Sequence, residues 1–360
     1  MSGLVGSGEP LVVRHDLAIL DLDGVVYVGP DAVPGAVAAL AQAQSLGMAR
    51  CFVTNNASRT PDSVAEHLST LGVPATPEEV LTSAQVAAAL LARRLAPGAK
   101  VLVVGGTGLQ VALRAEGLEP VAAMDDGPSA VVQGFSPTID WALLAEGTRA
   151  VRAGLPWVAS NLDATFPTVF GPAPGNGSLV QVIATASGRR PDAVAGKPEP
   201  EPFLEAVRRY GSTSPLVVGD RLDTDIEGGC AAKIPSLVVL TGVSGAGDLL
   251  RAGGHERPSY IGADLFALMQ SHPAVELDEG PLRHGSRSRC RDTLVELDTS
   301  SGDSRLQVVT AAGDPLDLLR AACTMSWAVA DSDPGRTPPN DPGPLVQALG
   351  AAATGAAWAR

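Results

Sequence analysis

The chain has 360 residues, of which 45% are hydrophobic and 18% charged, and its formal net charge at pH 7 is −13. At roughly 100–200 residues per domain this length predicts two or three domains, and the apolar content excludes a wholly disordered chain. An acidic chain repels the phosphate backbone of nucleic acids, so no nucleic-acid partner is expected.

Short apolar runs alternate along the chain with Ala- and Leu-rich stretches. The runs predicted as strands are Leu17–Leu22, Cys51–Thr54, Val101–Gly105, Ala130–Gln133, Trp157–Ser160, Leu216–Gly219 and Ser236–Leu240. The stretches predicted as helices are 35–46, 61–71, 83–95, 107–116, 140–153, 177–187, 201–210 and 224–231. This alternation predicts an α/β fold, in which parallel sheets carry helices on both faces.

The alternation weakens after about residue 272. The segment 283–291 holds four arginines among small polar residues, and we interpret it as a solvated linker. Beyond it we expect strands over Thr293–Leu297 and Leu306–Val309 and helices over 315–330 and 344–358. These elements predict a small α/β unit appended to the C-terminal side.

Four cysteines (Cys51, Cys230, Cys290 and Cys323) are widely spaced and form no CxxC pair. This spacing favours a reducing compartment over a disulfide framework or a zinc site. Residues 1–10 lack a basic region, and no stretch approaches the roughly 18 consecutive apolar residues of a membrane-spanning helix. We therefore expect a cytoplasmic protein without a membrane partner.

A pair of acids closes the first predicted strand. Asp21 and Asp23 come at its end, where Gly24 permits a sharp turn. The carboxyl ends of parallel strands are where open α/β sheets bind ligands. Two close carboxylates need a cation or a shared proton, and Mg²⁺ prefers oxygen ligands. The alternative is an Asp-Gly turn that does no more than end the strand.

A second acidic loop follows the strand that ends at Gly219. Its acids resemble the start of a calcium-binding loop, but the last liganding position would be Ile234, which excludes an EF-hand. Asp220 comes directly after the strand, where it is well placed to ligate a metal ion held together with Asp21.

Two further segments predict phosphate binding. Thr54 and Asn55 end an apolar strand, where a hydroxyl and loop amides can hold phosphate oxygens. The alternative interpretation of this segment is a helix N-cap at Ser58 or Thr60, before Pro61, and both can hold together. Lys197 is one of only three lysines and precedes Pro198, which is predicted to open a helix. A lysine beside the free N–H groups of a helix start would bind phosphate, and the alternative is an ordinary surface lysine.

These four motifs, each at a strand end and in this order, resemble the pattern of the haloacid dehalogenase-like hydrolases. The resemblance covers about residues 14–270 and is to the branch with a large α/β cap, with the actinobacterial glycerol 3-phosphate phosphatases as the most similar group. It implies a doubly wound, Rossmann-like parallel-sheet core over 11–81 and 195–272 and an inserted cap over 82–194. Residues 273–360 would be a C-terminal α/β extension of unknown role.

The resemblance also implies residue roles. Asp21 would be the nucleophile that forms an aspartyl-phosphate, and Asp23 would act as acid and then as base. Mg²⁺ would be held by Asp21, the backbone carbonyl of Asp23, and Asp220, while Asp225 would orient metal-bound water. The residues expected to bind the phosphoryl oxygens are Thr54, Asn55 and Lys197.

The substrate is less sharply indicated. The resemblance places a specificity loop near residues 161–167 of the cap, where the candidates are Asn161, Asp163, Phe166 and Pro167. Some relatives have His where Phe166 aligns, so a packed cap residue is an equal interpretation of Phe166. Glycerol 3-phosphate is the favoured small phosphorylated substrate, and phosphoglycolate, nucleotides, pyridoxal phosphate and a homodimeric state are left open.

Three other functions are compatible with parts of the sequence. A phosphomutase would use the same nucleophile and acid. A non-catalytic interaction protein would have no need of the intact acid and lysine set. A dinucleotide-binding protein is suggested by the strand and glycine-rich turn at Val101–Gly108, but Val111 replaces the third glycine and Asp125 or Asp126 fits the acid position only loosely. A tight turn between strand and helix is therefore preferred there.

Overall fold

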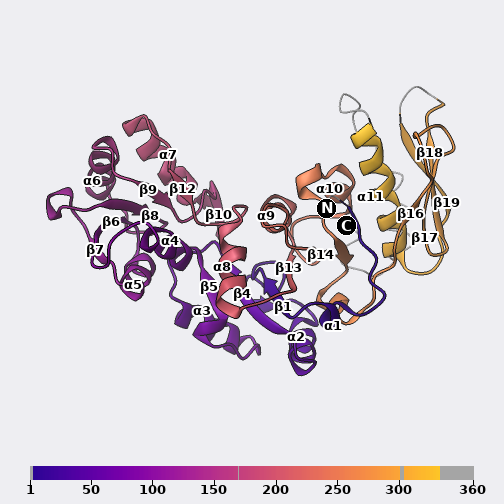
Figure 1. Ribbon diagram of the computed structural model, residues 1–360, viewed down its shortest axis with the longest axis horizontal. Helices are drawn as coiled ribbons and strands as arrows, with labels where there is room; N and C mark the ends of the chain where they lie inside the picture. Colours follow the sequence, from indigo (N-terminus) through magenta and orange to yellow (C-terminus); the bar gives the residue numbers. More distant parts are fainter. Residues whose placement is uncertain (1–2, 169, 301–303, 333–360) are drawn as a thin grey trace. The chain divides into compact units, whose positions relative to one another are not determined.

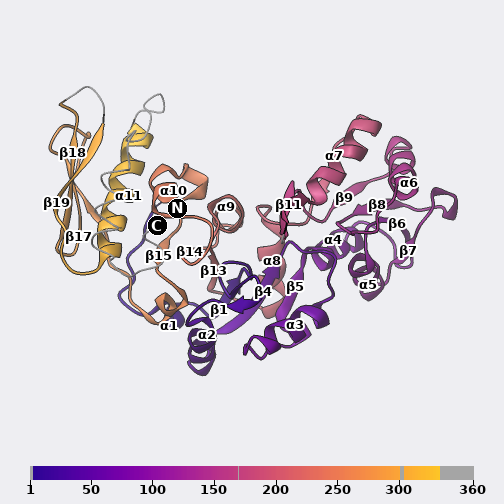
Figure 2. The ribbon, with the colours of Figure 1, turned by 180° about the vertical axis from the view of Figure 1, so that it is seen from behind.

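The computed structural model describes residues 3–168, 170–300 and 304–332, with the side chain of Pro167 left outside this part. The chain divides into two compact units, one of residues 1–50 with 210–360 and the other of residues 51–209. Figures 1 and 2 show both units from opposite sides. The expected division into core, cap and extension stays a prediction.

The first unit is built on four parallel strands in the order β15-β14-β13-β1. Almost every residue of these strands is buried, as sheets covered on both faces require. The strands are β1 (Leu17–Leu20), β13 (Pro215–Gly219), β14 (Ser236–Val239) and β15 (Tyr260–Gly262). The helices of this part are α1 (Leu11–Arg14), α2 (Ala36–Ser45), α9 (Glu227–Ala231) and α10 (Ala246–Arg251), with a π-helical turn η3 (Leu222–Ile226) and a short hairpin of β2 (Tyr27–Val28) and β3 (Asp31–Ala32).

The C-terminal part of this unit is an antiparallel sheet covered by a long helix (Figures 1 and 2). The sheet has the order β16 (Glu276–Leu277), β17 (Arg287–Cys290), β18 (Thr293–Asp298) and β19 (Arg305–Thr310), and the helix is α11 (Pro315–Ser332). The linker interpretation of 283–291 is therefore wrong over β17. Ser288 and Cys290 are buried there while Arg287 and Arg289 are exposed, so the arginines form the solvent face of an alternating strand. The predicted helix over 344–358 lies outside the described residues.

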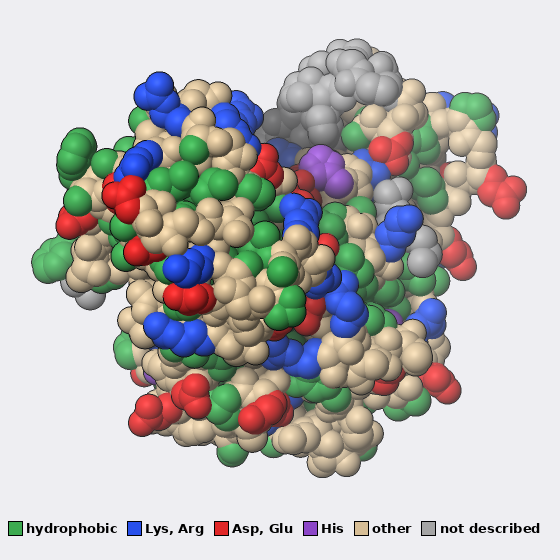
Figure 3. All heavy atoms as spheres, turned by 60° about the vertical axis from the view of Figure 1, so that its left-hand side comes forward, with side chains coloured by type: hydrophobic (Ala, Val, Ile, Leu, Met, Phe, Trp, Pro, Cys, Tyr) green, Lys and Arg blue, Asp and Glu red, His purple; other side chains and the backbone are tan. Residues whose placement is uncertain are grey.

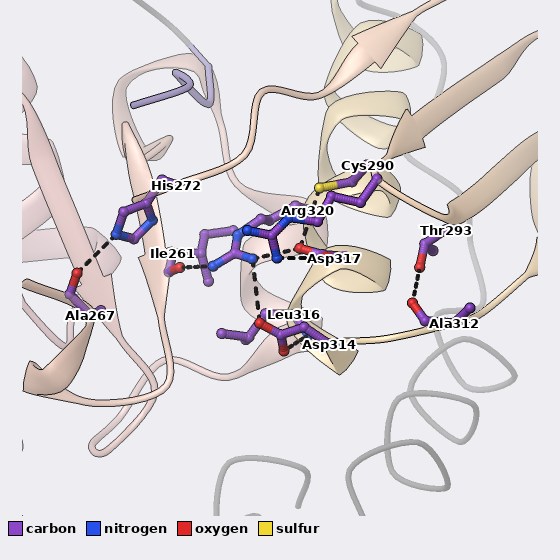
Figure 4. A network of polar contacts seen from close by, with 11 residues as sticks. Ile261, Ala267, His272, Cys290, Thr293, Ala312, Asp314, Leu316, Asp317 and Arg320 are labelled. Atoms are coloured by element: carbon purple, nitrogen blue, oxygen red, sulfur yellow. Dashed lines mark hydrogen bonds and ion pairs between the residues drawn. The ribbon is translucent and has the colours of Figure 1, made fainter. Parts of the chain in front are cut away.

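Helix α11 is bound to the parallel sheet by a buried arginine, Arg320, which also forms an ion pair within the helix. Figure 4 shows the Arg320 guanidinium bonded at once to Asp317 of its own helix and to the carbonyl of Ile261 in β15. The two distances are 2.7 and 2.8 Å, and both charged side chains are buried. Apolar side chains of α11, including Leu319 and Trp327, share one core cluster with Leu249 of α10 and Ile261.

The second unit holds a five-stranded parallel sheet in the order β12-β9-β8-β6-β7. The strands are β6 (Lys100–Val104), β7 (Glu119–Val121), β8 (Ala130–Gln133), β9 (Trp157–Ala159) and β12 (Ala193–Val194). Helices α6 (Trp141–Arg152) and α7 (Asn176–Ser187) pack on one face, and α4 (Ser83–Ala92) and α5 (Thr107–Ala115) lie on the other (Figure 1). The unit also contains the parallel pair β4 (Ala49–Thr54) and β5 (Val80–Thr82), the hairpin β10 (Thr165–Thr168) with β11 (Gly171–Pro174), and helices α3 (Pro61–Thr70) and α8 (Glu201–Tyr210).

The predicted α/β fold is confirmed, and all seven predicted buried strands up to residue 240 form at the expected places. In that range, sequence analysis missed strands β2, β3, β5, β7 and β12, which have only two or three residues, and the four-residue strands β10 and β11. The glycine turn after β6 has a packing role. A Cβ on Gly108 would lie 2.3 Å from the carbonyl oxygen of Ala57, so glycine lets α5 approach that backbone.

The helices and the surface charges bear on possible membrane and nucleic-acid partners. Among the described residues, no helix combines the length and apolarity needed to cross a membrane. On the face drawn in Figure 3, basic and acidic side chains of the described part are interspersed rather than segregated. A phosphate backbone would therefore meet no broad positive field on that face.

Candidate active site

Three carboxylates meet at the carboxyl ends of β1 and β13. Asp21, Asp220 and Asp225 each offer one oxygen, and these three oxygens lie within 4.8 Å of one another. The register explains the meeting, because Leu20 pairs with Val218 and the N–H of Asp21 donates to the Val218 carbonyl at 2.9 Å. Asp220 and Asp225 are each only 1% exposed. Buried anions at this separation demand a compensating charge.

The loop after β14 shapes the surroundings of Asp220. Its Oδ2 accepts a hydrogen bond from the Val243 N–H at 2.7 Å, and its carbonyl accepts one from the Ser244 N–H at 3.0 Å. Two glycines leave space for the carboxylate: a Cβ on Gly242 would lie 1.9 Å from Oδ2, and one on Gly24 would lie 2.3 Å from it. The position of this carboxylate is therefore fixed by backbone on two sides.

The acidic turn η3 orients Asp225 in the same way. The Arg221 N–H donates to its Oδ2 at 3.2 Å, and the Leu222 N–H donates to Ser244 Oγ at 3.1 Å. The Arg221 guanidinium bonds Asp223 at 2.7 Å, and this bond, followed by the nearby charges of Asp220 and Asp225, raises the arginine pKa. The guanidinium is thus paired outside the three-acid cluster.

The residues present fit a hard divalent cation such as Mg²⁺. The cluster offers only carboxylate oxygens, which is the ligand type that Mg²⁺ prefers, and Gly24 and Gly242 keep side-chain bulk away from Asp220. Asp23 is exposed, and its side chain is not part of the cluster. Its expected backbone contribution to the metal stays a prediction.

In the second unit, Thr54 and Asn55 lie at the end of β4. The buried Thr54 hydroxyl accepts from the Asn56 N–H at 3.1 Å. The helix cap belongs to another residue, because Thr60 accepts from the N–H of Ser63 at the start of α3. The N-cap that was the alternative interpretation of this segment is thus present at Thr60, before Pro61, and it leaves the binding role of Thr54 and Asn55 as a prediction.

Lys197 is 5% exposed, which contradicts an ordinary surface lysine. Its backbone N–H donates to Asn55 Oδ1 at 2.8 Å, and its carbonyl accepts from Asn55 Nδ2 at 3.1 Å. The expectation that Pro198 opens the helix is wrong. Helix α8 begins at Glu201, and the carbonyl of Pro200 accepts its first bonds, so Lys197 lies in the preceding turn.

The cap residues divide into two groups. Asn161 and Asp163 are hydrogen-bonded to Asn55. Asn161 Nδ2 donates to the Asn55 carbonyl at 2.7 Å, and both carboxylate oxygens of Asp163 lie 3.2 Å from Asn55 Nδ2. Phe166 packs edge-to-face on Phe135, with ring centroids 4.8 Å apart. Pro167 lies in β10, and its side chain is outside the described part.

Sequence analysis missed several residues that hold these groups. Val243 and Ser244 orient the acids of the first unit, and Ser83 donates to the Asn55 carbonyl in the second. The sequence does carry one signal for Val243 and Ser244. They lie in a loop of mostly small residues that follows a buried strand, as the loops with Asp21 and Asp220 do. The backbone donors themselves leave no mark in a sequence.

Comparison with known proteins agrees with this geometry. Residues 18–119 match the family described as haloacid dehalogenase-like hydrolase, and residues 194–268 match a family described as HAD-hydrolase-like. D-glycerol 3-phosphate phosphatase of Mycobacterium tuberculosis is 48% identical over 322 residues, which cover 87% of this chain and 89% of that protein.

Solved structures of a glycerol phosphate phosphatase from M. tuberculosis have the same fold. Its calcium complex superposes with a TM-score of 0.82 at 42% identity, covering 96% of this chain and 98% of the other. Its magnesium complex gives a TM-score of 0.77 at 44% identity, covering 89% and 92%. Both matches include most of the C-terminal part beyond residue 272.

Proposed function

The chain belongs to the haloacid dehalogenase-like hydrolases, and on that premise we propose that it is a Mg²⁺-dependent phosphatase of small phosphomonoesters. The observation that carries the proposal is the group of three carboxylates at the ends of β1 and β13. A carboxylate is a competent nucleophile toward phosphorus once a cation offsets the repulsion between the two anions. When bound, Mg²⁺ supplies that positive charge.

The proposed reaction has two steps. One carboxylate oxygen of Asp21 bonds to phosphorus while the ester P–O bond breaks, and the proton of Asp23 goes to the departing alkoxide. Asp23 then takes a proton from water, whose oxygen attacks phosphorus and breaks the bond to Asp21. Inorganic phosphate leaves, and both residues return to their starting protonation states.

The other groups are assigned to binding. Lys197 and Thr54 are proposed to hold the phosphoryl oxygens, where charge increases in the transition state. Asp220 and Asp225 are proposed, with Asp21 and the Asp23 carbonyl, as the ligands and orienting groups of the metal. The exposed position of Asp23 is consistent with a proton donor that must reach the leaving group.

We propose glycerol 3-phosphate as the substrate, because the M. tuberculosis relative named for that activity is 48% identical over most of both chains. A cytoplasmic location is proposed from the four cysteines, all of which are free thiols. A homodimer stays a prediction, which light scattering of the purified protein would check.

The test is phosphate release from glycerol 3-phosphate, phosphoglycolate, pyridoxal phosphate and a nucleoside monophosphate. Each ester is assayed with Mg²⁺ and with EDTA, using wild type, Asp21→Asn and Asp23→Asn. We expect glycerol 3-phosphate to give the highest kcat/KM. Asp21→Asn should lose on the order of 10⁴-fold or more, and Asp23→Asn about 10²–10⁴-fold. The exposed carboxylate variant Glu116→Gln is the matched control and should retain wild-type rates.

Three outcomes would overturn parts of this proposal. Release that survives EDTA would exclude the metal requirement. Normal turnover by Asp21→Asn would exclude it as the nucleophile. Phosphate that moves between positions of a sugar phosphate without release would identify a phosphomutase instead.

A further inference from the structure

The side-chain amide of Asn55 is engaged by protein groups on both of its polar atoms. Nδ2 donates to the Lys197 carbonyl at 3.1 Å and to the Asp163 carboxylate at 3.2 Å, while Oδ1 accepts from the Lys197 N–H at 2.8 Å. An amide has two N–H donors, so these bonds use its whole donor capacity. No N–H of this side chain is left to bind a phosphoryl oxygen.

The backbone of Asn55 is held as firmly as its side chain. Its carbonyl accepts from Asn161 Nδ2 at 2.7 Å and from Ser83 Oγ at 2.6 Å. Asn161 Oδ1 in turn accepts from the Asp163 N–H at 3.1 Å, and Asn161 is buried. The segment 160–163 is thereby tied to the end of β4 through the side chains of Asn161 and Asp163.

Glycines let these backbones approach one another. A Cβ on Gly196 would lie 2.7 Å from the Ser160 carbonyl oxygen and 2.8 Å from Asn55 Oδ1. On the opposite side of the segment, a Cβ on Gly177 would lie 2.2 Å from the Leu162 carbonyl oxygen. The segment is therefore confined by contacts that only glycine permits, and it has little room to shift independently of Lys197.

We propose that Asn55 is a positioning residue: its side-chain amide couples Asp163, in the segment expected to govern specificity, to the backbone of Lys197. This rests on the proposed phosphatase function, in which Lys197 holds the phosphoryl group. A displacement of Asp163 would then be transmitted to Lys197 through one amide. The coupling makes Asn55 and Asp163 energetically interdependent, which residues that contact the substrate separately would not be.

The test is a double-mutant cycle based on an exchange of groups. Asn55→Asp keeps the acceptor for the Lys197 N–H but sets a second carboxylate against Asp163. Adding Asp163→Asn exchanges the two groups, so that an amide N–H at position 163 faces a carboxylate at position 55. We expect Asn55→Asp to lower kcat/KM about 10²-fold, as a shift of about 1 Å in a positioned group can do. The double variant should recover at least tenfold of that loss, with the recovery mostly in kcat.

Asn56→Asp is the matched control for the added charge, because Asn56 is exposed and, within the described part of the chain, its side chain bonds to the neighbouring Ser58. It should remain within about threefold of wild type. Chemical denaturation of all four members of the cycle measures the same coupling without any activity, and it should also be non-additive. The equilibrium dissociation constant of inorganic phosphate, measured by calorimetry, should weaken in Asn55→Asp and recover in the double variant.

The results separate this proposal from the proposed function. Additive losses in denaturation and in kcat/KM, with an active wild type, would overturn the role of Asn55 and leave the phosphatase in place. A wild type that hydrolyses no ester would overturn the function, while denaturation would still report whether the two residues are coupled. Coupling seen in denaturation but in neither kcat/KM nor phosphate affinity would reduce Asn55 to a purely structural residue.

Discussion

The N–H of Val243 donates to Oδ2 of Asp220 at 2.7 Å, so a loop 23 residues further along the chain orients a buried carboxylate of the acid cluster. The loop can do this because Gly242, just before it, has no Cβ to occupy the space of that carboxylate. The arrangement makes the glycine as sensitive to change as the acid itself.

Gly242→Ala is therefore expected to displace Asp220, since the new Cβ would start 1.9 Å from Oδ2. A movement of about 1 Å in a positioned group costs about 10²-fold in kcat/KM. The Mg²⁺ concentration for half-maximal activity should also rise, and a thermal shift on adding Mg²⁺ should shrink. Gly254→Ala, where nothing lies within 4 Å of the added carbon, is the control. Equal kinetics for the two variants would contradict the steric role.

A buried histidine predicts how stability depends on pH. Burial lowers the pKa of His272 to about 4, and the neutral ring donates from Nε2 to the Ala267 carbonyl at 3.1 Å. Between pH 6.5 and about 4 the unfolded state therefore binds a proton that the folded state does not. Stability should fall as pH decreases through this window, by up to about 3 kcal/mol, and level off below it.

Urea denaturation of wild type and His272→Gln at several pH values measures this effect. The glutamine does not titrate and can still donate to the Ala267 carbonyl, so its pH dependence should be flatter. His15, whose pKa burial also lowers, retains a smaller dependence of the same sign. Parallel curves for the two proteins would show that His272 is not the responsible group.

The thiols should differ sharply in reactivity. Burial raises the pKa of Cys51 and of Cys290 to about 12 and raises that of the fully enclosed Cys323 as well, whereas Cys230 is half-buried. Because the thiolate is the reactive form, an aromatic disulfide reagent at pH 8 should modify one thiol in the native protein and four in denaturant. Cys230→Ser should remove the native reaction, and rapid modification of a second thiol would contradict these assignments.

The ion pair between Arg320 and Asp317 should act as a unit (Figure 4). Arg320→Met leaves a buried carboxylate whose remaining side-chain partners are the half-exposed Arg291, 3.3 Å away, and the Cys290 thiol, so a loss of about 3 kcal/mol of unfolding free energy is expected. Replacing both partners, as Arg320→Met with Asp317→Leu, should recover most of this loss. Denaturation of the full chain measures both, and a double variant worse than the single would contradict the argument.

Sequence patterns predicted that Asp21 and Asp220 would meet, because each follows a continuous apolar run and such runs form buried parallel strands whose ends meet. Asp225 follows no such run, and only the resemblance to the hydrolase family indicated it. The patterns failed at β17, where exposed arginines alternate with buried small residues. Arg287 and Arg289 resembled a charged linker, although the intervening Ser288 and Cys290 are buried and define a strand. The role of Asn55 was not predictable, because an amide between two loops has no periodicity that would reveal its partners.

The attachment of α11 bears on how this chain can be shortened. Trp327 Nε1 and Ser326 Oγ donate to the carbonyls of Leu249 and Leu250 at the end of α10, and Arg320 occupies the Ile261 carbonyl on the outermost strand. A fragment ending at residue 272 would bare this strand and the apolar face beside it. An open parallel edge is a template for strand addition between molecules. We therefore expect a fragment that ends at residue 272 to aggregate more readily than the full chain.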